Sequence, residues 1–92
     1  MSVADAIRRK LSDRFRPVRL EILDESYRHA GHAGARPEGE THFSITIVAA
    51  AFAGLGRVAR HRLVNEALAE ELAGPVHALA LRTLSPEEDN AR

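Results

Sequence analysis

The sequence predicts a small α+β domain in which three strands form one sheet and the helices pack on one of its faces. Apolar residues recur with helical spacing in two stretches and with the alternation typical of strands in three others. These stretches follow the order helix, strand, strand, short turn, helix, strand, which a sheet covered by helices on one face accommodates. Because 92 residues suffice for only one modest core, we expect residues 1–92 to form a single domain.

The first helix is expected over residues 3–15. Ser2 and Asp5 resemble a capping box in which Asp replaces the usual Glu, and Pro17 follows the expected end of the helix. The apolar stripe of this helix consists of Val3, Ile7, Leu11 and Phe15. Spacings of four residues place these side chains on one helix face, which would pack on the core.

Two alternating stretches after this helix predict an antiparallel pair of strands. In "VRLEILDE", residues 18–25, Val18, Leu20 and Ile22 share one face. In "HFSITIVA", residues 42–49, Phe, Ile and Ile share one face and His, Ser and Thr the other. Residues 26–41 between them carry three glycines and a proline, and loops of such length are usually functional or disordered.

The second half of the chain predicts a long helix, a third strand and a tail. "AFAGLG" is expected to hold one short helical turn, and a helix then starts near Arg57 and ends at Gly74 and Pro75. Its apolar stripe includes one polar member, Glu71. Residues 76–84 alternate with apolar side chains on both faces, which favours a central strand. Ser85 as a cap and Pro86 at the first helical position resemble a helix start, but no large apolar residue follows to dock it, so we expect residues 85–92 to be a frayed tail.

The composition excludes several kinds of site. The chain has no cysteine, which rules out disulfides, thiol catalysis and a self-contained cysteine-ligated zinc or iron–sulfur site. The formal net charge is zero, so binding to nucleic acid through overall charge is not expected. Neither a secretory signal nor an apolar run long enough for a bilayer is visible, and we expect a cytoplasmic, bacterial protein with no membrane association.

Histidine is the soft-metal ligand that remains. His29 and His32 lie in the long loop, His42 closes it, and His77 follows the Gly-Pro corner at the start of the third strand. A histidine held by a strand and a histidine from a loop could together form a site with two imidazole ligands. Such a site would be incomplete, because structural zinc usually has four ligands, so the pair could supply part of a metal centre shared with another molecule. On spacing alone, the default interpretation of His77 is a strand-end histidine bonded to a backbone carbonyl, and that of His29 and His32 is solvated loop residues.

The remaining polar clusters are weaker signals. Arg57, Arg60 and Arg62 form a basic cluster on the long helix that could contact phosphates, although glutamates follow on the same helix. No nucleophile elbow and no glycine-rich phosphate loop is visible. We therefore expect no enzymatic activity from this chain alone.

Five segments together resemble the BolA-like proteins. In order they are "LEILDESYRH", "ETHFSITIV", "FAG", "RHRLVNEALAEEL" and "GPVHALALRTLSPEE", and the similarity covers about residues 3–88. The resemblance implies a class II KH-like fold, a three-stranded mixed sheet with helices on one face in the order α-β-β-α-α-β. The family usually continues into a C-terminal helix with an aromatic residue, and from residues 85–92 we expect that helix to be missing or frayed here.

The resemblance also implies a function. BolA-like proteins pair with monothiol glutaredoxins and hold a bridging [2Fe–2S] cluster, with sulfur from the glutaredoxin cysteine and from glutathione. The BolA-like partner gives the histidine of the "VHAL" motif, here His77, and a second ligand from the loop between the first two strands. The isolated chain, a monomer or weak homodimer, would then hold no cluster. The expected role is a non-enzymatic adaptor in iron–sulfur cluster trafficking or iron regulation.

The loop ligand and a second role stay open. Counting forward from "DES" places the family's loop ligand at His29, and counting back from "THF" places it beside His32; we favour His29. His42 matches the family's strand start and is interpreted as structural. Some members are DNA-binding transcriptional regulators, a role that would map here to Arg57, Arg60 and Arg62. A protein-interaction module without a cluster is the third possibility.

Overall fold

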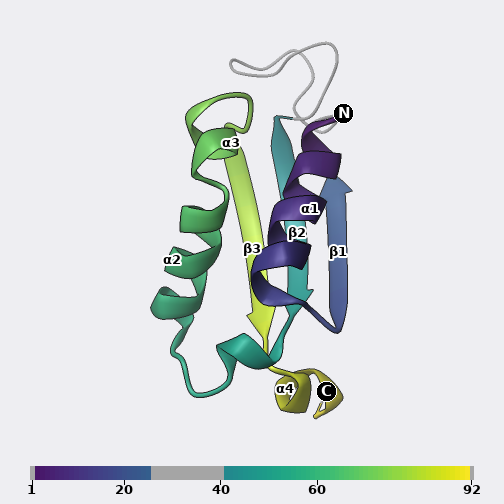
Figure 1. Ribbon diagram of the computed structural model, residues 1–92, viewed down its shortest axis with the longest axis vertical. Helices are drawn as coiled ribbons and strands as arrows, with labels where there is room; N and C mark the ends of the chain where they lie inside the picture. The colour runs from purple at the N-terminus through teal and green to yellow at the C-terminus, as the bar shows by residue number, and fades with distance from the viewer. Residues whose placement is uncertain (1, 26–40, 92) are drawn as a thin grey trace.

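The computed structural model describes residues 2–25 and 41–91. Its elements, in chain order, are α1 (Val3–Phe15), β1 (Arg19–Asp24), β2 (His42–Val48), the 3₁₀ helix η2 (Ala50–Phe52), α2 (Arg57–Ala67), α3 (Ala69–Ala73), β3 (Ala78–Leu84) and α4 (Pro86–Asn90). The mixed α+β class is confirmed, with α1 and α2 on the same face of a three-stranded sheet (Figure 1). Among the described helices, none combines the length and apolarity required to cross a bilayer.

The sheet has the order β1-β2-β3, so β2 is the central strand. β1 pairs antiparallel with β2, as predicted, and β2 pairs parallel with β3, because the helical crossover returns the chain to the same end of the sheet. The prediction of a central third strand was wrong. On β3, Ala78, Ala80 and Arg82 are exposed and only the alternate residues face the helices. Alanine suits a solvated face as well as a buried one, and this ambiguity misled the sequence pattern.

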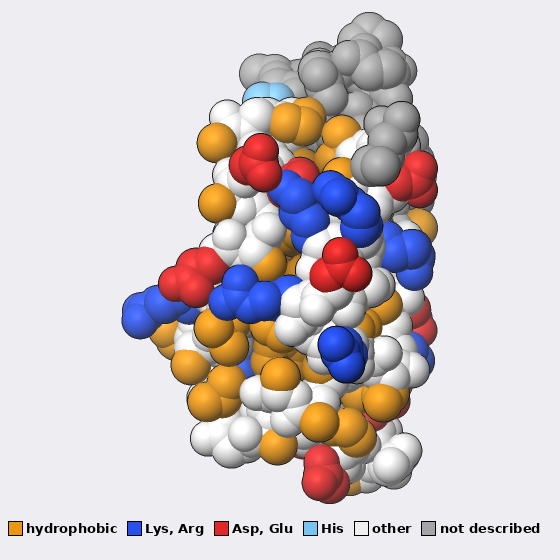
Figure 2. Space-filling view, viewed as in Figure 1, with side chains coloured by type: hydrophobic (Ala, Val, Ile, Leu, Met, Phe, Trp, Pro, Cys, Tyr) orange, Lys and Arg blue, Asp and Glu red, His pale blue; other side chains and the backbone are white. Residues whose placement is uncertain are grey.

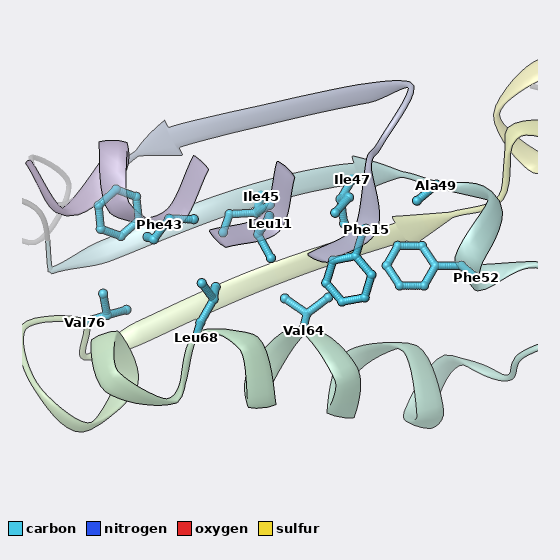
Figure 3. Close-up of a cluster of buried hydrophobic side chains, with 11 residues drawn as sticks. Leu11, Phe15, Phe43, Ile45, Ile47, Ala49, Phe52, Val64, Leu68 and Val76 are labelled. Atoms are coloured by element: carbon cyan, nitrogen blue, oxygen red, sulfur yellow. The ribbon is translucent and has the colours of Figure 1, made fainter. Parts of the chain in front are cut away.

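The core lies between the sheet and the two long helices. The stripe of α1 is buried through Ile7, Leu11 and Phe15, and α2 contributes Val64. The rings of Phe15 and Phe52 lie with their centroids 5.2 Å apart, which joins the end of α1 to η2 (Figure 3). Each fully buried side chain of this size contributes about 1.5–3 kcal/mol relative to its exposed state, so this layer is the main source of stability.

The first helix begins and ends as the sequence predicts. The Ser2 hydroxyl accepts from the Asp5 backbone N–H at 3.0 Å, and the capping box is complete. At the other end, Arg16 adopts a left-handed conformation with φ 47°, and its N–H donates to the Ser12 carbonyl. The strand that follows starts at Arg19, and Val18, which the alternation grouped on one face with Leu20 and Ile22, is 71% exposed.

The predicted long helix is divided in two. Leu68, with φ −107° and ψ 22°, separates α2 from α3 while its own side chain stays buried. The polar member of the stripe, Glu71, is also buried, and the Lys10 Nζ atom lies 2.8 Å from its carboxylate. This ion pair joins α1 to α3 and explains how a carboxylate is tolerated on an otherwise apolar face.

The expected frayed tail is instead the helix α4. Ser85 caps it, with a second complete capping box formed by Glu88. Two ion pairs hold α4 on the domain, Arg60–Glu88 at 2.6 Å and Arg19–Asp89 at 2.7 Å. The prediction was wrong because it looked for an apolar anchor, whereas the partners of α4 are arginines distant in sequence.

Candidate functional site

His77 stands immediately before β3, at the end of the sheet where β2 and β3 both begin. Its backbone N–H donates to the Thr41 carbonyl at 2.8 Å, and the Ala78 N–H donates to the same oxygen at 3.2 Å. The residue is nevertheless exposed. The backbone of His77 is thus fixed by the sheet while its imidazole faces solvent, as a ligand to a group shared with another molecule requires.

His42 lies beside His77. The two ring centroids are 6.4 Å apart, and the rings are inclined by 36°. The Thr41 Oγ1 and His42 Nδ1 atoms form a hydrogen bond of 2.8 Å, which fixes the orientation of the half-buried His42 ring from a fully buried hydroxyl. Sequence reasoning missed this proximity. The parallel register that pairs His42 with Ala78 is what brings the two histidines together.

The ends of the long loop attach to the same end of the sheet. The Glu25 N–H, at the end of β1, donates to the His42 carbonyl at 2.7 Å, and Thr41 directly precedes β2. Histidine is also visible on the surface at that end of the molecule (Figure 2). His29 and His32, the two candidate loop ligands, lie outside the described residues.

The described residues do not form a complete metal site. Residues 2–25 and 41–91 contain no group of three or more histidine, aspartate and glutamate side chains that could hold an ion. The donor atoms present at this end are imidazole nitrogens, which suit iron, copper, zinc and nickel. The absence of cysteine means that thiolate ligands would have to come from another molecule.

The structure divides the basic cluster on α2. Arg60 is buried, and its Nε and Nη1 atoms donate to the carbonyls of Leu55 at 2.8 Å and Thr83 at 3.1 Å. Its guanidinium also makes a two-pronged contact with Glu88, at 2.6 and 3.0 Å. Arg60 therefore does not fit the phosphate-contacting role that its neighbours in sequence suggested. Arg57 and Arg62 remain exposed on α2.

These contacts change the acidity of nearby groups. The hydrogen bonds from Arg60, followed by one from the Ser85 backbone, lower the pKa of Glu88 to about 2. Burial, and then the charge of Arg57, lower the pKa of His61 on α2. Glu88 is thus a carboxylate and His61 an uncharged imidazole near neutral pH.

Comparison with known proteins agrees with this architecture. The BolA-like protein family matches residues 11–88. The "DNA-binding transcriptional regulator BolA" of Vibrio cholerae is 48% identical over 86 residues, covering 94% of this chain and 77% of that protein. "BolA-like protein 1" of Mus musculus is 49% identical over 94% of this chain and 60% of its own length.

A solved structure extends the agreement to three dimensions. The BolA domain of SufE1 from Arabidopsis thaliana superposes with a TM-score of 0.86 at 44% identity, covering 96% of each chain. The element order and the sheet described above are therefore those of known relatives. This chain belongs to the BolA-like protein family.

Proposed function

We propose that this protein is a non-enzymatic adaptor that pairs with a monothiol glutaredoxin and gives histidine nitrogen to a bridging [2Fe–2S] cluster. The role would lie in iron–sulfur cluster trafficking or iron regulation. The observation that carries the proposal is the exposed imidazole of His77 on a backbone fixed by hydrogen bonds to Thr41. Membership of the BolA-like family supports it, because pairing with a glutaredoxin is what the resemblance in sequence implies.

The donor atoms fit one half of such a cluster. His77 would bind iron directly, and His29 or His32 would supply the second nitrogen. Cysteine is absent, so the glutaredoxin cysteine and glutathione would supply the sulfur ligands on the other side. Replacing thiolate by neutral imidazole raises the reduction potential of a [2Fe–2S] centre, as in Rieske proteins. The mixed complex would therefore be easier to reduce than a glutaredoxin homodimer with the same cluster.

Reconstitution of the mixed complex tests this function. The chain is combined with a monothiol glutaredoxin, glutathione, iron and sulfide, and visible absorption and circular dichroism spectra are recorded. We expect a spectrum that differs from that of glutaredoxin alone, and we expect His77→Ala to lose this difference. A spectrum unchanged by His77→Ala would contradict the proposal.

Matched variants identify the loop ligand. Whichever of His29→Ala and His32→Ala alters the spectrum marks the ligand, and we expect it to be His29→Ala. His61→Ala is the control, because His61 is a half-buried histidine on α2 that lies near the last residues of β3, apart from the end of the sheet where β2 and β3 begin. An equal effect of His61→Ala would show that any loss of imidazole disturbs the complex.

DNA binding is the second candidate function. It is favoured by the similarity to the DNA-binding transcriptional regulator BolA of Vibrio cholerae and by the exposure of Arg57 and Arg62 on α2. The affinity for duplex DNA is measured at several salt concentrations, and the logarithm of the binding constant is plotted against the logarithm of the salt concentration. If both arginines contact phosphates, the slope of this plot should be shallower by about two in the double variant Arg57→Gln, Arg62→Gln. An affinity for duplex DNA that does not change with salt concentration would exclude the phosphate contacts. His77→Ala should leave the affinity for the duplex unaltered.

A further inference from the structure

A cavity opens between α2, β3 and α4, apart from the histidine end of the sheet. Its volume is about 470 Å³, within the range of roughly 300–1,000 Å³ typical of small-molecule sites. Figure 1 shows that α2 runs beside β3 and that α4 follows the end of that strand. The residues that line the cavity belong to these three elements and to the turn before α2. The described structure thus holds a concave surface that the cluster proposal does not use.

Two cations line this cavity without a counterion. Arg57 lies in the first turn of α2 and Arg82 on the exposed face of β3, and both are exposed. Neither has an ion pair to any residue in the described part of the chain. The third arginine of the cavity, Arg60, is already neutralised by Glu88. The cavity therefore carries an excess of positive charge, although the whole chain has a net charge of zero.

The remaining walls combine a polar and an apolar part. The His61 imidazole lines the cavity, and burial with the charge of Arg57 lowers its pKa, so that it is uncharged near pH 7. The apolar part is formed by Leu55, Leu81 and Leu84. Guanidinium groups match the oxygens of a phosphate group, and apolar walls suit the organic body attached to it.

We propose that the cavity between α2, β3 and α4 binds a small organic phosphate, with Arg57 and Arg82 on its phosphate group and the three leucines against its organic part. This goes beyond the cluster adaptor and uses none of its ligands, so it does not depend on His77. It also differs from duplex binding by the outer face of α2. A duplex would engage Arg62, which lies outside the lining of this cavity.

Phenyl phosphate is the probe, because it carries a phosphate dianion on a compact apolar ring. The full chain is titrated in phosphate-free buffer at constant ionic strength, and amide shifts are followed by ¹H–¹⁵N correlation spectra. We expect saturable shifts at residues of α2, β3 and α4 that line the cavity. Arg57→Gln and Arg82→Gln should each weaken the affinity about tenfold or more, since each removes a charge-assisted contact.

The controls separate the possible outcomes. Arg62→Gln and His77→Ala should bind phenyl phosphate as the parent does, and far-ultraviolet circular dichroism should show all variants folded. Inorganic phosphate binding as tightly as phenyl phosphate would overturn the organic part of the assignment. No saturable shift, or equal loss with Arg62→Gln, would overturn the site itself. Shifts produced by a 20-base-pair duplex and not by phenyl phosphate would assign the arginines to DNA instead.

Discussion

The two ends of the sheet use polar side chains in opposite ways. Where β2 and β3 begin, the backbone is tied by the Thr41 carbonyl, and the imidazole of His77 is left exposed. Where β3 ends, the side chains themselves form the ties, because Arg60 contacts two carbonyls and Glu88. A side chain that binds a group shared with another molecule must stay free of contacts within its own chain, so only its backbone can hold it in place. A side chain that joins two elements of the fold uses its polar atoms in those contacts and has none left for a ligand.

Arg60 illustrates the second use. The Leu84 carbonyl accepts from the Ala49 N–H on the β2 side, so by strand alternation the Thr83 carbonyl points to the free edge of β3. Arg60 donates to that Thr83 oxygen and reaches Glu88 on α4 with the same guanidinium. One side chain therefore covers part of a strand edge and holds the C-terminal helix.

The largest expected difference between the two ends is in stability. Arg60→Ala leaves the carbonyls of Leu55 and Thr83 without their donor and removes one of the two ion pairs that hold α4, so we expect it to lower the free energy of unfolding by about 2–3 kcal/mol. His77→Ala removes an exposed ring and should change it by less than about 0.5 kcal/mol. Urea denaturation of both variants measures the contrast.

Arg62→Ala is the matched control for Arg60→Ala, because Arg62 is an exposed arginine on the same helix. It should change stability by less than about 0.5 kcal/mol. Equal losses for the two arginine variants would mean that Arg60 does not act through its contacts. A large loss of stability in His77→Ala would mean that the side chain of His77 also holds the fold together, and the two ends of the sheet would then not differ in this respect.

A smaller effect is expected from the pH dependence of the Arg60–Glu88 pair. The pKa of Glu88 is about 2 in the folded protein, below its value of about 4.3 in an unfolded chain. The charge of Glu88 therefore stabilises the fold above about pH 4.3, and this contribution is lost as pH falls toward 2. The stability difference between the parent and Glu88→Gln should be constant above pH 5 and should disappear near pH 2. Other carboxyl groups titrate in both proteins and cancel. A difference that persists unchanged at pH 2 would refute the role of the charge.

Local signals explain what the sequence could predict. The capping box at Ser2, the apolar stripe of α1 and the alternation of β1 and β2 depend on neighbours within a few residues, and these predictions were confirmed. Two of the errors concern long-range pairings. The position of β3 at the edge follows from parallel pairing, and the ordering of α4 follows from Arg19 and Arg60, which are distant along the chain.

The candidate site shows the same division. His77 could be singled out because its motif and the Gly-Pro corner are local. The proximity of His42 to His77 could not, since it depends on the register of two strands separated in sequence by η2, α2 and α3. The ion pair of Arg60 with Glu88 could not be predicted either, because Glu88 looked like an exposed residue of a tail.

The variant Thr41→Val tests how far the end of the sheet where β2 and β3 begin depends on side chains and not on backbone hydrogen bonds. Thr41→Val removes the hydroxyl that bonds the His42 Nδ1 atom but keeps the carbonyl that holds the His77 backbone. We expect a loss of stability of about 1 kcal/mol, a change in the His42 tautomer detected by ¹⁵N spectroscopy, and an unaltered spectrum of the mixed glutaredoxin complex. Loss of that spectrum in a folded Thr41→Val protein would contradict the view that backbone hydrogen bonds alone position His77 for the cluster. It would mean that the orientation of the His42 ring, and not only the backbone of His77, determines whether this end of the sheet holds the cluster.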